Sequence, residues 1–298
     1  MIAEKLDGVT SILNKRKVLK GIPARSRDGI GFLDLGVTLV RYRKAGIGKQ
    51  TLVFFTDPPI VIEHYDYLIS CLRQNYQVIV VEAPGFGFSL PSTSLKYDLV
   101  SSVQVVEQIL MQLLQIKATL IAPCGFGYVA LEVAQKRPDL ISHLVLSQVP
   151  SWQEMLKWKE HRDPKHVLAT PILGQLLLMA LKRSRARAWL KTAMSNHSLL
   201  ESFNELVQVS FSQGAAFNLA SSFQNLFTGR APVTPSSDCP TLFVWGDGDA
   251  SHCKCAKQSS LDMVPHADIF RIKDAGHFPE LEATDEFLGP VLDFLHKH

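Results

Sequence analysis

The chain has 298 residues, with 31 lysines and arginines against 28 aspartates and glutamates, which leaves a formal net charge of +3. Hydrophobic residues make up 46% of the sequence and charged residues 20%, proportions typical of a soluble globular protein rather than of long disorder or a coiled coil. Because nucleic-acid-binding proteins usually carry a clustered basic stripe, this small charge excess gives no reason to expect a nucleic-acid partner.

Short β-branched apolar runs alternate with helical patterns along the chain, after a segment at 28–45 that reads as a leading hairpin. The predicted strands are residues 51–55, 77–81, 118–121, 143–146, 241–245 and 267–272, and the helical patterns cover about 60–75, 97–115, 126–137 and 284–296. Runs that are apolar on both sides suit strands of a parallel sheet buried on both faces. The alternation therefore predicts an α/β fold with a mostly parallel central sheet and helices on both faces.

Residues 151–230 interrupt this rhythm with several amphipathic helical patterns and no convincing strand, and the sheet resumes at Pro240. The proline-rich stretch 231–237 reads as the linker that returns to the sheet. The length fits about two domains or one large domain with an insertion, and the strand pattern favours the insertion. We expect a core formed by residues 1–150 and 231–298 and an inserted helical cap at 151–230.

The odd number of cysteines argues against a disulfide framework, since they are spread along the chain as Cys71, Cys124, Cys239, Cys253 and Cys255. No apolar signal segment follows the first methionine, and the longest apolar runs are far shorter than the roughly 20 residues that span a bilayer. We therefore expect a cytoplasmic protein without membrane contact, in which a functional cysteine acts as a thiol.

One cysteine lies where a strand turns into a helix, in the sequence Pro123-Cys124-Gly125-Phe126-Gly127. A nucleophile on such a sharp turn stands clear of the sheet, and the helix N-terminus lowers the pKa of a thiol placed there. The segment resembles the G-x-S-x-G nucleophile elbow of the α/β-hydrolase superfamily, with Cys124 where serine usually stands. Cysteine takes that place in relatives such as dienelactone hydrolases and polyhydroxyalkanoate synthases.

The resemblance extends over roughly residues 30–298. Asp249 follows strand 241–245 and His277 follows the last predicted strand, which are the places where the family carries its acid and its histidine. Glu82 opens a stretch that looks like the family's D-x-x-G-x-G-x-S. The resemblance implies a triad in which His277 takes the thiol proton, Asp249 fixes the histidine tautomer, and the Cys124 thiolate attacks an acyl carbon.

The oxyanion site departs from the family pattern. Where the family has His-Gly and then a residue whose N–H binds the oxyanion, this chain has Thr56-Asp57-Pro58, and Pro58 has no N–H. The N–H of Gly125 remains, and loss of one such donor costs about 10²–10³ in rate. The residues expected to serve oxyanion or substrate binding are Gly125, Thr56, Asp57, Tyr128 and Trp152, with a Thr56 or Tyr128 side chain as a possible replacement donor.

A cysteine nucleophile with a weakened oxyanion site suits activated acyl donors, so the expected substrate is a thioester, lactone or ester. The basic run 182–187 could meet an anionic carrier such as coenzyme A or an acidic carrier protein, although such runs are usually solvated faces. Two alternatives stay open: a lyase or cyclase that uses His277 as its base, and a catalytically silent binding protein of the same fold.

Two further motifs compete with this interpretation. Residues 125–130 also fit the dinucleotide fingerprint G-x-G-x-x-A, but they follow the wrong crossover, and no acid ends the next strand. His252-Cys253-Lys254-Cys255 is rich in metal-capable side chains but lacks the spacing of a zinc site. We therefore expect neither a cofactor nor a bound metal.

Overall fold

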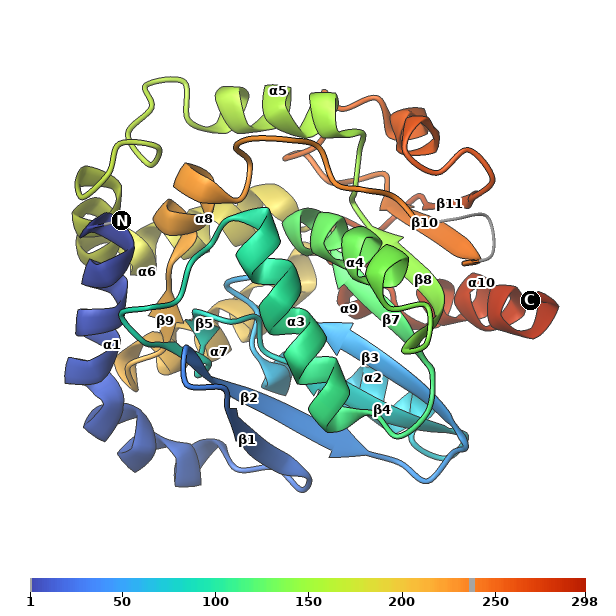
Figure 1. The fold of residues 1–298 in the computed structure, drawn as a ribbon, viewed down its shortest axis with the longest axis horizontal. Helices are drawn as coiled ribbons and strands as arrows, with labels where there is room; N and C mark the ends of the chain where they lie inside the picture. The colour runs from blue at the N-terminus through green and yellow to red at the C-terminus, as the bar shows by residue number, and fades with distance from the viewer. Residues whose placement is uncertain (1, 236–238) are drawn as a thin grey trace.

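The computed structural model describes residues 2–235 and 239–298 (Figure 1). Its main sheet has the strand order β1-β2-β4-β3-β7-β8-β10-β11. These strands are β1 (Ile30–Asp34), β2 (Thr38–Ala45), β3 (Gln50–Phe55), β4 (Tyr76–Val81), β7 (Ala118–Pro123), β8 (Ile141–Ser147), β10 (Thr241–Gly246) and β11 (Asp268–Ile272). Strands β1 and β2 form the predicted antiparallel hairpin, β2 also runs antiparallel to β4, and the pairings from β4 to β11 are parallel.

Helices cover both faces of the sheet, as predicted (Figure 1). Helices α3 (Leu99–Leu113) and α4 (Cys124–Lys136) contribute to one apolar core, and α2 (Asp66–Leu72), α9 (Pro279–Glu282) and α10 (Thr284–Lys297) contribute to the other. Successive side chains of a strand point to opposite faces. In β3, for example, Val53 and Phe55 enter the first core and Leu52 and Phe54 the second, which explains the unbroken apolar run.

A long helical segment separates β8 from β10. It comprises α5 (Trp152–Arg162), α6 (Leu173–Ala193), α7 (Leu200–Ser212) and α8 (Leu219–Asn225), with short 3-10 turns at His197–Leu199 within it and at Lys257–Asp262 beyond β10. The segment also contains the two-residue strand β9 (Ala216–Phe217), which was not predicted; it pairs with the equally short β5 (Phe86–Gly87). Of the expected linker 231–237, Ser236 and Ser237 lie outside the described residues.

Helix α1 (Ile2–Gly21) was not predicted. Its apolar residues are spread around the helix, so that Ile2 and Leu13 are exposed while Ala3 and Val18 are buried. The helix packs beside β6 (Leu90–Pro91), which is paired with β2, and beside α6. A 3-10 turn at Ile22–Arg25 follows it. No helix in the described ranges is long and apolar enough to cross a membrane.

Glu82, the acid that opens the family-like stretch after β4, holds that loop through buried polar contacts. Its carboxylate accepts hydrogen bonds from the guanidinium of Arg41 at 3.0 Å and from the N–H groups of Phe88 at 2.6 Å and Ile62 at 3.2 Å. Another 3-10 turn, Ile62–Tyr65, begins at this contact. Arg41 also binds Glu63 at 2.8 Å, so the buried guanidinium faces two carboxylates. Because a buried charge is tolerated only when it is paired, Glu82 has a structural role here.

Candidate active site

Cys124 is the first residue of α4, directly after β7, and it is 7% exposed. Its φ of 44° lies in the left-handed region that residues with a side chain rarely adopt, a form of strain that concentrates at functional sites. A Cβ on the neighbouring Gly125 would lie 3.0 Å from Cζ of Phe227, so the elbow is closely covered. The bulky Phe126 points to the side and stacks on Phe55 with ring centroids 5.5 Å apart.

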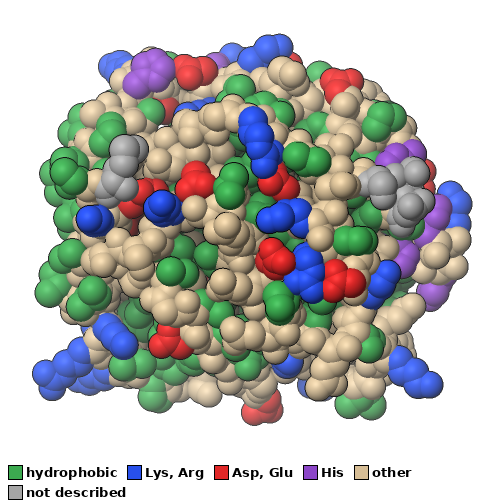
Figure 2. Space-filling view, in the orientation of Figure 1, with side chains coloured by type: hydrophobic (Ala, Val, Ile, Leu, Met, Phe, Trp, Pro, Cys, Tyr) green, Lys and Arg blue, Asp and Glu red, His purple; other side chains and the backbone are tan. Residues whose placement is uncertain are grey.

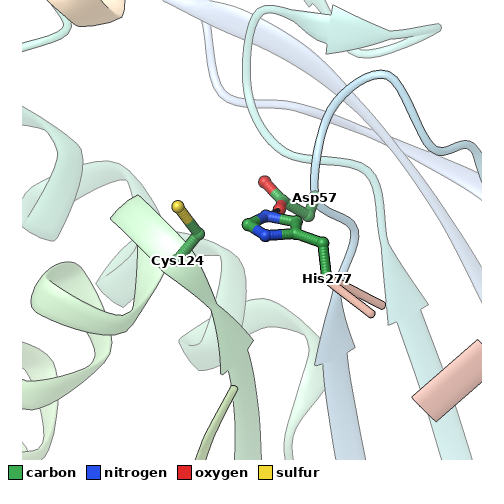
Figure 3. Close-up of side chains that lie close together, drawn as sticks. All are labelled: Asp57, Cys124 and His277. Atoms are coloured by element: carbon green, nitrogen blue, oxygen red, sulfur yellow. Dashed lines mark hydrogen bonds and ion pairs between the residues drawn. The ribbon is translucent and has the colours of Figure 1, made fainter. Parts of the chain in front are cut away.

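The structure brings the predicted triad residues together. Asp249 follows β10 and His277 follows β11, and the carboxyl ends of parallel strands share one edge of the sheet. His277 Nδ1 lies 2.7 Å from Asp249 Oδ2. Cys124 Sγ lies within 4.8 Å of a His277 nitrogen and of an Asp57 oxygen, and Figure 3 shows the three side chains converging from separate segments.

Asp57 takes a position that the sequence did not anticipate. Its Oδ2 lies 2.7 Å from Nε2 of His277, the nitrogen expected to face the nucleophile. Both ring nitrogens of His277 are therefore hydrogen-bonded to carboxylates, an arrangement that suits the protonated imidazolium with its two donors. Burial opposes the charge, but the charge of Asp249 and the hydrogen bonds to Asp249 and Asp57 raise the pKa of His277 well above its usual range.

The pKa of the Cys124 thiol is shifted downward, opposite to that of His277. Burial and the negative charge of Asp57 favour the neutral thiol, yet interaction with the neighbouring His252 and His277 side chains outweighs both and lowers its pKa. A thiolate is the nucleophilic form of cysteine. The site therefore favours a reactive thiol before any substrate arrives.

His252 is the residue that the sequence interpretation missed. It is 1% exposed, and its Nδ1 lies 2.9 Å from the same Asp249 oxygen that binds His277. Its ring stacks between His277 and Trp158, with centroids 5.0 Å away on each side. Its position three residues after Asp249 places both residues in the same loop, and this spacing could have indicated a contact between them. The neighbouring cysteines suggested a metal site instead.

The other predicted site residues are near the elbow but are already engaged. The Thr56 hydroxyl accepts the N–H of Ala83 at 3.5 Å, and the Tyr128 hydroxyl donates to the carbonyl of Pro150 at 2.9 Å. Trp152 packs edge-on against Tyr128. Gly125 is the second residue of α4, and N–H groups in the first turn of a helix have no partner within the helix. Gly125 thus remains the predicted backbone donor.

Two groups of side chains have ligand atoms within 4.8 Å of one another, Asp57 with Cys124 and His277, and Asp249 with His252 and His277. In both groups a His277 nitrogen lies 2.7 Å from a carboxylate oxygen. Zinc ligands at about 2.0 Å from a tetrahedral ion stand roughly 3.3 Å apart, so a metal would require these pairs to separate. The arrangement fits hydrogen bonding better than metal binding.

The basic run 182–187 lies on α6, where two of its side chains contact the protein itself. Lys182 donates to the carbonyl of Ala215 at 3.1 Å, and Arg187 pairs with Glu201. On the face drawn in Figure 2, basic and acidic side chains are intermixed rather than gathered into one stripe. The run therefore offers fewer free cations to an anionic partner than its sequence suggests.

The sequence profile of the α/β hydrolase fold matches residues 61–284. The chain belongs to the α/β-hydrolase fold family. It is 21% identical over 279 residues to the cis-3-alkyl-4-alkyloxetan-2-one decarboxylase of Shewanella oneidensis, covering 89% of this chain and 87% of that one. It is 25% identical to the mouse sn-1-specific diacylglycerol lipase ABHD11, covering 75% and 73%. The epoxide hydrolase VrEH1 of Vigna radiata has the same fold, with a TM-score of 0.72 and 15% identity, covering 92% and 99%. Relatives of this hydrolase fold therefore include enzymes with several different substrates.

Proposed function

We propose that this α/β-hydrolase fold protein is an enzyme that uses Cys124 as a nucleophile to hydrolyse or transfer an activated acyl group. The observation that carries the proposal is the elbow: Cys124 is held at a φ of 44° at the start of a helix, with its Sγ within 4.8 Å of His277. The lowered pKa of the thiol supports the same role. Backbone strain of this kind concentrates at functional sites, which favours an active protein over a silent one.

In the proposed reaction the Cys124 thiolate attacks the acyl carbon, and the carbonyl electron pair moves to oxygen. Collapse of this intermediate forms an acyl-thioester on Cys124 and expels the leaving group, which takes a proton from a neighbouring imidazolium. Water or another nucleophile then attacks the acyl-thioester and regenerates the thiol. The assigned nucleophile is Cys124, and the histidine that exchanges its proton is one of the two that share Asp249, His277 or His252. The Gly125 N–H is the assigned oxyanion donor.

The choice of substrate follows from the charge beside the elbow. Asp57 places a carboxylate within 4.8 Å of Cys124 Sγ, and Pro58 has no N–H, so a developing oxyanion gains little stabilisation on that side. Thioesters and lactones are activated donors and need less of this help than amides or alkyl esters. Apolar side chains of Leu226 and Phe227 cover Gly125, which suits an apolar acyl chain. Coenzyme A or an acidic carrier protein remains a proposed source of the thioester.

The alternatives gain different support from the geometry. A lyase or cyclase with His277 as its base is disfavoured, because both nitrogens of His277 are already bonded to carboxylates. A silent binding protein is favoured by one observation, the replacement of the oxyanion donor by Pro58 with Asp57 beside it. That candidate predicts no covalent adduct at all.

Covalent labelling separates these candidates. The protein is incubated with short-chain and medium-chain acyl thioesters and a β-lactone probe, and the adduct is located by mass spectrometry of peptides. We expect one adduct on Cys124 that disappears completely in Cys124→Ala and persists in Cys71→Ala, which removes an exposed thiol. Labelling that continues undiminished in Cys124→Ala would contradict the proposal, and an unlabelled wild-type protein would favour the silent candidate.

A further inference from the structure

His252 lies beside the predicted triad but is not a member of it, and one of its ring nitrogens is buried without a partner among the described residues. Its Nδ1 faces Asp249 Oδ2 at 2.9 Å and Ser251 Oγ at 3.0 Å, while its Nε2 is buried and has no hydrogen-bond partner among the described residues. An unpartnered polar atom in the protein interior is costly and calls for an explanation. Here the atom belongs to a titratable group beside the proposed nucleophile.

Only one nitrogen of each histidine remains for the thiol. The rings of His252 and His277 are 21° from parallel with centroids 5.0 Å apart, and both Nδ1 atoms bind the same Asp249 oxygen. Nε2 of His277 already lies 2.7 Å from Asp57 Oδ2, and Cys124 Sγ lies within 4.8 Å of a His277 nitrogen. The Cys124 thiol also interacts with the His252 side chain, whose buried Nε2 has no competing carboxylate.

The electrostatics agree with this geometry. Burial disfavours the charged form of His252, but hydrogen bonding to Asp249 and interaction with the Cys124 thiol raise its pKa. The groups that face the histidine are Asp249, Ser251, His277 and Cys124, with the indole of Trp158 on its other face. Trp158 is fixed by a hydrogen bond from its Nε1 to the carbonyl of Ser251 at 3.0 Å, which holds the stack in place.

We propose that His252, rather than His277, is the proton partner of Cys124, so that the working triad is Cys124, His252 and Asp249. The Sγ–H bond breaks and an Nε2–H bond forms on His252, while the electron pair stays on sulfur. Asp249 stabilises the resulting imidazolium through Nδ1–H. His277 stays charged between Asp249 and Asp57, where it orients Asp249 and adds positive charge near the thiolate. This assignment deepens the proposed function and rests on it for its catalytic meaning.

Thiol ionisation tests the assignment without any substrate. The rate of Cys124 alkylation by iodoacetamide is measured against pH by peptide mass spectrometry, in wild type, His252→Gln, His277→Gln and the surface control His266→Gln. We expect His252→Gln to slow alkylation at pH 7 about tenfold and to move the midpoint of the profile upward, because the thiol returns toward an ordinary cysteine. His277→Gln changes the rate about threefold or less, and His266→Gln leaves it unchanged.

A larger effect of His277→Gln than of His252→Gln, or equal effects of the two, would overturn the assignment. His252→Phe keeps an aromatic ring between Trp158 and His277, so it answers the same question if the glutamine variant unfolds; thermal melts identify that case. Because alkylation needs no acyl donor, the two proposals can fail separately. A shifted alkylation profile without acyl labelling would reject the proposed function alone, and acyl labelling with an unshifted profile would reject the role of His252 alone.

Discussion

The turn after β7 and the turn after β3 meet at the same site, yet they differ in what they preserve of the fold family. The first turn holds Cys124 at a φ of 44°, with glycines on both sides of Phe126. The second contains Pro58, which has no N–H, and Asp57, whose carboxylate binds His277. The turn after β7 keeps the geometry of the family's elbow, and the turn after β3 has a proline and a carboxylate where the family resemblance implies an oxyanion donor.

This difference indicates that electrostatics has changed more than architecture. Here two histidines and two carboxylates surround the thiol of Cys124, and contact with both carboxylates raises the pKa of His277 while the pKa of the thiol is lowered. Variants at or beside each of the two turns test this difference.

On the β3 side, Glu280 carries the largest expected effect. Burial, with a smaller contribution from the charge of Asp57, raises its pKa to about 7. The folded state therefore holds this proton more tightly than the unfolded state, so stability falls as the pH rises from about 4.5 to about 7. The loss amounts to about 3 kcal/mol at about 1.4 kcal/mol per pKa unit. Chemical unfolding of wild type and Glu280→Gln at pH 5 and pH 8 measures it.

The glutamine variant should lack most of this pH dependence, since its side chain does not titrate. Glu205→Gln, at an exposed position on α7, serves as the control and should keep the wild-type slope. Identical slopes in wild type and Glu280→Gln would show that the carboxyl is not held neutral near Asp57.

On the elbow side, Gly127→Ala tests how tightly the turn is packed. A Cβ at this position would lie 2.4 Å from Cγ2 of Val149, closer than atoms can approach. We expect a loss of about 2 kcal/mol in the free energy of unfolding, in the range for an overpacked core. The double variant Gly127→Ala with Val149→Ala removes the clash and should lose less than the sum of the two single changes. Strict additivity would mean that the two positions do not contact each other.

Asp57→Asn addresses the contrast between the turns directly, with the smallest expected effect. Because the charge of Asp57 raises the pKa of the Cys124 thiol, removing that charge should lower this pKa further. We expect alkylation of Cys124 at pH 6 to become about fivefold faster, which corresponds to about 1 kcal/mol. Asp139→Asn, at an exposed position beside Arg137, is the matched control. A slower reaction in Asp57→Asn would mean that the carboxylate assists the thiol instead of opposing it.

The sequence predicted the sheet, the leading hairpin and the helices on both faces, because strands buried on both sides leave a continuous apolar pattern. It did not predict α1, since that helix has no apolar stripe and takes its place through contacts with β6 and α6. Cys124, Asp249 and His277 were found because each follows a recognisable strand, and the structure brings them together, although their catalytic roles remain a proposal. The role of Asp57 was not foreseen, because a carboxylate next to a proline carries no signal of its partner.

The amino-acid sequence by itself determined the fold family, the place of the elbow and the absence of an N–H at Pro58, since these depend on local pattern and on the chemistry of single residues. Only the tertiary structure decided which groups touch His277 and His252. Hydrogen bonds between Asp57 and His277 join residues 220 positions apart, and the sharing of Asp249 by two histidines depends on how a loop folds against α5. Such partners fix the protonation of the site, and protonation is set by contact distance rather than by order along the chain.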